Sequence, residues 1–210
     1  MAYIANTAFE VKVSNHEFDS TANITGIFLN SDSAKEICSA GFLCTRSALT
    51  VNEGYNAVGP ESAPVTIKNT NTWNMIAATA SALAQAGIYA CNPFDVNMVT
   101  DPVTGAVYKV GSNTLGLPAP AGYPTTYTRI RFDNDHVYRF GAGNVNGAVG
   151  SNTIFTIAAG LLVPASAAPA GNGAPYFELV GTGKFTQGAY QGFDYYDLRA
   201  CMTVAQVSGS

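Results

Sequence analysis

Residues 132–143, FDNDHVYRFGAG, place two aspartates, an asparagine and a histidine side by side, with arginines before and after them and glycines behind. Carboxylates next to a histidine are groups that serve in acid–base catalysis and in metal binding. The same residue types also form tight turns, because Asp and Asn side chains hydrogen-bond to their own backbone. The sequence around these residues must decide between a site and a turn.

The flanking residues favour a turn. Apolar and polar residues alternate over 125–132 and again over 136–140, which is typical of strands. A calcium site would need more oxygen ligands at alternate positions and a following glycine. A catalytic pair of Asp135 and His136 would need a nucleophile that the sequence does not place. We therefore predict a turn in a hairpin, across which three arginines could neutralise Asp133 and Asp135: Arg129, Arg131 and Arg139.

Other motifs with chemical potential are weak. GAGNVNG, residues 141–147, begins like a nucleotide-binding loop but lacks the spacing, the helix and the acidic residue, so a glycine-rich bend is predicted. Asp194 and Asp197 flank two tyrosines, a combination that can bind sugars and that also fits exposed acids at a strand edge. No G-x-S-x-G, H-E-x-x-H or P-loop motif occurs. We predict that the protein is not an enzyme and has no cofactor.

The composition limits the possible partners. Only 11% of the 210 residues are charged and the net charge is −4, so no basic surface for nucleic acid is expected. The first residues lack the features of a signal peptide. The sequence has no uninterrupted apolar run of about 18 residues, so no membrane span is expected. The four cysteines show no C-x-x-C spacing, so buried free thiols are expected rather than a zinc site or disulfides: Cys38, Cys44, Cys91 and Cys201.

The elements that must position these residues are mostly strands. Short apolar or alternating runs separated by Gly, Pro, Asn and Asp predict one all-β domain over 1–210, an antiparallel β-sandwich or jelly-roll-like barrel with at most one or two short helices. SALAQA, 81–86, is the helix candidate, and DPVTG predicts a hairpin between 96–99 and 106–110. The other strands are expected at 9–13, 24–29, 37–46, 73–78, 88–91, 125–132, 136–140, 153–157, 176–180 and 195–204. Residues 205–210 are expected to be a disordered tail.

Seven stretches resemble a protein family. They are MAYIANTAF, FDSTANITGIFLN, EICSAGFLC, GIYACNPFDV, VGSNTLGLPAPAG, RIRFDNDHVYRFGAGN and YFELVGTGKFT. Together they resemble the small structural proteins of tailed bacteriophages that are similar to head decoration proteins. The resemblance implies a virion protein, made in the bacterial cytoplasm, that binds the outside of the capsid in many copies and stabilises it. Its implied partners are the major capsid protein and further copies of itself, with a homotrimer as the first expectation.

Two segments are expected to reach those partners. Residues 1–9 could form an extended arm, with Ala2, Tyr3, Ile4 and Phe9 as contacts whose loss would weaken particle binding more than folding. The Pro/Ala/Gly segment 163–175 could form an exposed loop, with its prolines as contacts: Pro164, Pro169 and Pro175. A carbohydrate-binding β-sandwich is the alternative, which would need exposed aromatics such as Trp73, Tyr195 and Tyr196 in a groove.

Overall fold

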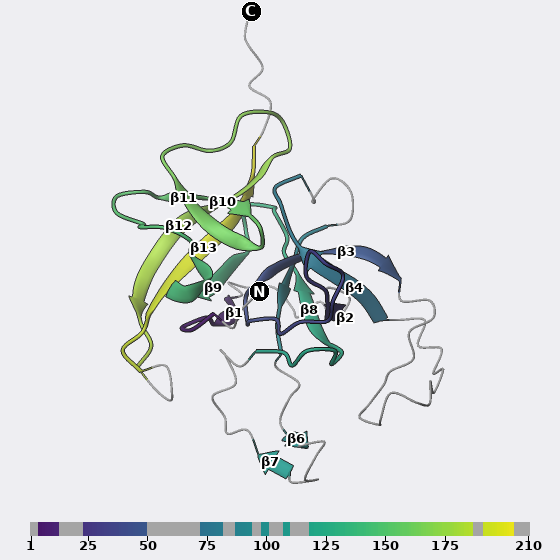
Figure 1. Cartoon of the computed structure of the whole chain (residues 1–210). Coiled ribbons are helices and arrows are strands. Elements are labelled where there is room, and N and C mark those ends of the chain that lie inside the picture. Colours follow the sequence, from purple (N-terminus) through teal and green to yellow (C-terminus); the bar gives the residue numbers. More distant parts are fainter. Residues whose placement is uncertain are drawn as a thin grey trace, which may run out of the picture.

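The computed structural model describes residues 4–12, 23–49, 72–81, 87–93, 98–100, 107–109, 118–186 and 191–203. Within these residues the fold is all-β, as predicted, with one short 3₁₀ turn at Ala142–Asn144. A six-stranded sheet lies on the left of Figure 1 and a closed five-stranded barrel on the right. No helix in the described part of the chain has the length and hydropathy that crossing a membrane requires.

The barrel closes through the strand order β2-β4-β3-β5-β8, in which β2 and β4 run parallel and the other described pairs are antiparallel. Its strands are β2 (Asn23–Phe28), β3 (Leu43–Leu49), β4 (Thr72–Ala77), β5 (Tyr89–Cys91) and β8 (Thr125–Arg129). Gly26 faces inward here, because a Cβ on it would fall within 3.0 Å of the Met75 side chain. A closed barrel leaves no free edge, so every barrel strand is paired on both sides.

The sheet has the order β1-β9-β13-β12-β10-β11 and is antiparallel throughout. Its strands are β1 (Phe9–Lys12), β9 (Val137–Gly141), β10 (Ile154–Ala158), β11 (Leu161–Ala165), β12 (Pro175–Lys184) and β13 (Asp194–Met202). Alternation along the strands sends Tyr138, Phe140, Leu198 and Ala200 into the core and their neighbours to the opposite face. The register shifts between Leu179 and Gly181, which marks a β-bulge.

Two apolar clusters form the core. One fills the barrel, and the other lies between barrel and sheet, where Leu43 and Ile88 of the barrel side pack with aromatic side chains of the sheet. Backbone bonds join the two parts as well. Gly160 at the tip of the β10–β11 hairpin donates to Ala78 O at 2.9 Å, and its own carbonyl accepts from Leu43 N at 2.8 Å. Barrel and sheet therefore share one packed interior.

Most predicted strands are confirmed, and three expectations need correction or completion. β6 (Met98–Thr100) and β7 (Val107–Lys109) pair antiparallel, as predicted for the hairpin. The loop expected at 163–175 begins later, because β11 continues to Ala165. β11 forms a hairpin with β10 through a two-residue turn at Ala159 and Gly160, both of which have a positive φ. The helix candidate falls mainly on residues 82–86, outside the described residues.

The third correction concerns the two strands around the opening motif. β8 belongs to the barrel and β9 to the sheet, so the chain between them crosses from one part of the fold to the other. The turn prediction is confirmed, but the hairpin prediction is wrong. Local alternation identifies a strand, whereas the sheet that it joins depends on partners elsewhere in the chain.

Candidate interaction face

Asp133 organises the predicted turn. Its Oδ1 accepts hydrogen bonds from the backbone N–H groups of Asp135 and His136 at 3.1 and 3.2 Å, and its Oδ2 lies 2.7 Å from His136 Nδ1. Asn134 takes a positive φ of 67° at the centre. Burial raises the pKa of Asp133, but the hydrogen bonds from His136 and from the backbone outweigh it and hold that pKa below its usual value. The carboxylate thus serves the turn.

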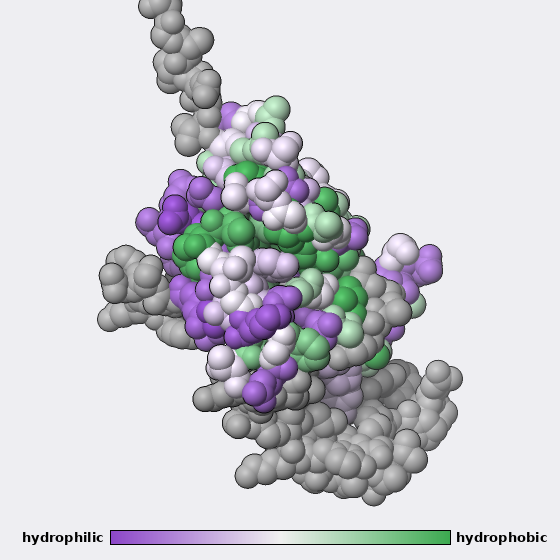
Figure 2. Space-filling view, turned by 90° about the vertical axis from the view of Figure 1, so that its left-hand side faces the viewer, coloured by the Kyte–Doolittle hydropathy of each residue, from purple (hydrophilic) through white to green (hydrophobic). Residues whose placement is uncertain are grey.

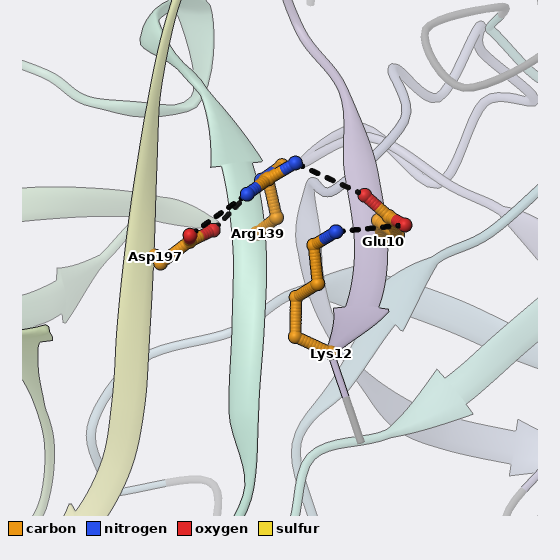
Figure 3. A network of polar contacts seen from close by, with 4 residues as sticks. All are labelled: Glu10, Lys12, Arg139 and Asp197. Atoms are coloured by element: carbon orange, nitrogen blue, oxygen red, sulfur yellow. Dashed lines mark hydrogen bonds and ion pairs between the residues drawn. The ribbon is translucent and has the colours of Figure 1, made fainter. Parts of the chain in front are cut away.

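The expected neutralisation of Asp133 and Asp135 by Arg139 is wrong. The Arg139 guanidinium makes a bidentate pair with Asp197, at 2.7 and 2.8 Å, and lies 3.5 Å from Glu10 (Figure 3). Lys12 lies 3.2 Å from the same Glu10. The register explains this choice, because Glu10, Arg139 and Asp197 stand directly opposite one another on three adjacent strands.

These charges lie on the outer face of the sheet, which we define as the side turned away from the barrel. Cross-strand register assigns to it Glu10, Lys12, Val137, Arg139, Ile154, Glu178, Gly181, Gly183, Tyr195, Asp197 and Arg199. A second pair joins Arg199 to Glu178 at 3.6 Å. Three acids and three bases are therefore paired, so the outer face has no net charge.

Two aromatic side chains lie next to the row of charges formed by Glu10, Arg139 and Asp197. The Arg139 guanidinium carbon lies 3.6 Å from the ring centroid of Tyr195, whose other neighbour Phe185 has its ring centroid 5.1 Å away. Tyr195 leans over Gly183, where a Cβ would come within 3.0 Å of its ring. The glycine on β12 is thus needed for the tyrosine to lie flat on the sheet.

Apolar side chains are exposed near this row. Val180, the extra residue of the bulge, is 51% exposed, and Phe193 beside the β12–β13 turn is 38% exposed. Figure 2, which views the sheet side of the molecule, shows hydrophobic residues gathered in a band between hydrophilic ones. Neutralised charges next to exposed apolar residues make the outer face suitable for contact with another protein surface.

The structure separates the residues proposed for sugar binding. Asp194 pairs with Lys184 at 2.6 Å, while Asp197 pairs with Arg139 on the opposite side of the strand. Tyr196 packs inward on Phe155. Trp73 lies on the barrel, half-buried, with the Arg46 guanidinium 4.6 Å over its ring. These aromatics do not share a groove.

The predicted interface residues are also spread apart. Ala2 and Tyr3 lie outside the described residues, and Ile4 packs partly buried against the barrel core. Phe9 is a core residue with 2% of its surface exposed, which corrects its placement on an arm. Pro164 is half-buried in β11 opposite Phe155, Pro169 is half-buried in the 166–174 loop, and Pro175 is buried in β12. Among the predicted contact residues that the structure describes, those of the loop between β11 and β12 remain the most accessible.

Sequence reasoning missed a thiol cluster inside the barrel. Cys38 Sγ lies 4.0 Å from Cys44 Sγ, and Cys91 Sγ lies 3.7 Å from the Cys38 carbonyl oxygen. All four cysteines of the chain are free and buried, as predicted. Burial and the neighbouring Cys38 raise the pKa of Cys44 and Cys91 well above the ordinary value, and burial raises that of Tyr127 beside them.

Cys38 differs from its neighbours. Burial raises its pKa, but hydrogen bonds with Cys44, Cys91 and Tyr127 outweigh burial and lower it, so that Cys38 would lose its proton before its neighbours. The described residues contain no group of three or more His, Cys, Asp or Glu side chains that could hold a metal ion. We interpret the cluster as packing, since a neutral buried thiol behaves as a small apolar side chain.

Comparison with known proteins gives no relative. No family model matches the chain, and no similar protein was found among the curated proteins or the solved structures.

Proposed function

We propose that this chain is a structural virion protein that binds the outer surface of a bacteriophage capsid in many copies and stabilises it, without catalytic activity. The sequence resemblance suggests this function, and the outer face of the sheet is the observation that supports it best. Its six charges are paired with one another, and Val180, next to Gly181 of this face, is half exposed. Such a face can pack against another subunit without leaving a buried charge unpaired.

The arrangement also suits repeated weak contacts. A shell offers the same contact many times, so each copy needs only modest affinity, and copies can meet one another around symmetry axes. The proposed partners are the major capsid protein and further copies of this chain, with a homotrimer as the simplest assembly. The proposed location is the capsid surface, after synthesis in the bacterial cytoplasm. Since the paired charges leave no net field on the outer face, binding should depend little on salt.

The first test is to count the copies of this chain per purified particle by quantitative mass spectrometry against the major capsid protein. Hundreds of copies are expected for a shell component. A few copies would instead indicate a tail or fibre protein, and absence from particles would refute the proposal.

The second test locates the contact. Val180→Asp places a charge at the bulge of β12, next to Gly181 of the outer face, and Ala121→Asp makes a comparable change at an exposed residue on the barrel side. Val180→Asp should lower the number of copies bound to purified capsids, while Ala121→Asp should not. Both variants should keep the wild-type melting temperature. Equal binding of all three proteins would exclude the bulge of β12 as part of the capsid contact.

A further inference from the structure

Residues 4–12, which we call the strap, lie between the barrel and the sheet. We call the site that holds them the slot, and its lining includes Gly41, Gly141, Gly143 and Asn144. Ile4 N donates to Ser39 Oγ of the barrel side at 3.2 Å, and Gly143 N donates to Asn6 O at 2.9 Å. Further along, Gly141 N donates to Ala8 O at 3.0 Å, and residues 9–12 pair with β9 as β1. The strap is bound by its backbone along most of its length.

Asn144 holds the centre of the slot. Its Oδ1 accepts from Ala8 N at 3.1 Å, and its Nδ2 donates to Ala40 O at 2.8 Å. The Asn144 side chain is buried and uses both ends of its amide, so it links the strap to the barrel loop.

The lining of the slot requires glycine. A Cβ on Gly143 would lie within 3.0 Å of the strap backbone at Ala5 and Asn6, and a Cβ on Gly141 would lie equally close to Asn6 O. Gly41, on the barrel side, has a φ of +73° and would bring a Cβ within 3.0 Å of Ala8 O. Three glycines from two distant segments thus leave room for the strap backbone that a Cβ would take up.

The strap contributes a side chain to the core as well. Phe9 lies with its ring centroid 5.4 Å from that of Phe140 and 6.0 Å from that of Tyr138. Slot and strap therefore have the properties of a peptide-binding site and its ligand, in which main-chain bonds provide attachment and one aromatic anchor provides the register.

We propose that the slot also accepts the strap of a second copy, so that two copies are joined by exchanging residues 4–12. The bonds from Ile4 and Ala8 reach residues 35 and 136 positions further along the chain, and they would be the same if another copy supplied the strap. Ten residues, 13–22, separate the strap from β2, and ten extended residues span up to about 35 Å. Exchange thus preserves the contacts, and only the path of the linker changes. The proposal does not depend on capsid binding, because its partner is this chain itself.

The balance between the two arrangements is set by concentration. A short linker keeps a chain's own strap at an effective concentration of the order of millimolar near its slot. Self-closure is therefore favoured in dilute solution, and exchange is favoured where copies are crowded or where self-closure is prevented.

The test uses two full-length variants that cannot close their own slots. Gly143→Val places a side chain where the strap backbone lies, so its slot cannot accept a strap. Phe9→Asp places a charge where the buried aromatic ring packs, so its strap cannot dock. A mixture can form one intact pair, in which the good strap of the first variant enters the good slot of the second. By light scattering, the mixture is expected to give a species of twice the mass that either variant gives alone. A mixture that behaves as the sum of its parts would refute exchange.

A second measurement keeps the proposal testable if either variant fails to fold. Glu10 and Arg139 are register partners across the slot, so Glu10→Cys in one copy and Arg139→Cys in another can form a disulfide between chains only after exchange. The two proteins are refolded together at high concentration and then oxidised by air. Glu10→Cys mixed with the exposed control Asn146→Cys measures random collision. Several-fold more covalent dimer in the first mixture is expected, and equal amounts would overturn the proposal.

Discussion

Replacing Asn144 by alanine tests how strongly the strap is built into the fold. The substitution leaves Ala8 N–H and Ala40 C=O without their partner, and both residues are buried. Each unsatisfied buried group costs about 1–3 kcal/mol, so the free energy of unfolding should fall by about 2–6 kcal/mol. This is a large part of the about 5–15 kcal/mol that a typical domain possesses.

Urea unfolding followed by circular dichroism, and a thermal melt, measure this loss. For a chain of this size each kcal/mol corresponds to about 2–4 °C, so the melting temperature should fall by at least about 4 °C. Asn146→Ala, two positions further along the chain and exposed, is the control and should stay within about 0.5 kcal/mol of wild type. Asn144→Asp keeps the acceptor for Ala8 but turns an oxygen toward Ala40 O, so it should cost at least as much as alanine. If Asn144→Ala were as stable as the control, the strap would not be held as described.

Three further outcomes are expected. Reducing agent should leave the melting temperature unchanged, and thiol reagents should label the cysteines only after unfolding, because the thiols are free and buried; labelling of the native protein would contradict this. The lowered pKa of Asp133 means that its carboxylate adds stability above its ordinary value of about 3.9 and that this stability is lost as the pH falls through the folded pKa. Wild type should accordingly lose more stability than Asp133→Asn between pH 5 and pH 2 in urea titrations, and equal losses would exclude the role of the charge. In Gly160→Ala the new methyl group would clash with the Phe42 ring at a residue that already has a positive φ. This variant should therefore lose clearly more stability than Gly150→Ala, where φ is also positive but nothing lies within 4 Å of the new Cβ. Similar melting temperatures of the two variants would show that Phe42 moves aside.

The strand content of the chain could be predicted from the sequence because alternation is a local property. Residues 137–141 alternate as Val137, Tyr138, Arg139 and Phe140, and the structure buries the second and fourth. The turn at Asp133 was also predictable, because its side chain bonds only to its immediate neighbours.

The long-range pairing could not be predicted in this way. The partner of Arg139 is Asp197, 58 positions away, and the two residues meet because β13 lies next to β9 in the sheet. The slot is hidden for the same reason, since Gly41 and Gly143 meet only when the barrel is placed against the sheet. β11 escaped prediction because Pro164 and small residues are typical of loops, although Pro is also tolerated on an edge strand such as this one.

The position of β1 in the sheet has a consequence for synthesis on the ribosome. The strap emerges before its partner β9, which begins at Val137, and β9 in turn pairs with β13, which begins at Asp194. At about 5–20 residues per second, the chain needs roughly 10–40 s to pass from the strap to the end of β13. During that interval the apolar ring of Phe9 has no completed site to enter. β1 is thus made well before the strands that complete its site, so its docking is a late step in folding.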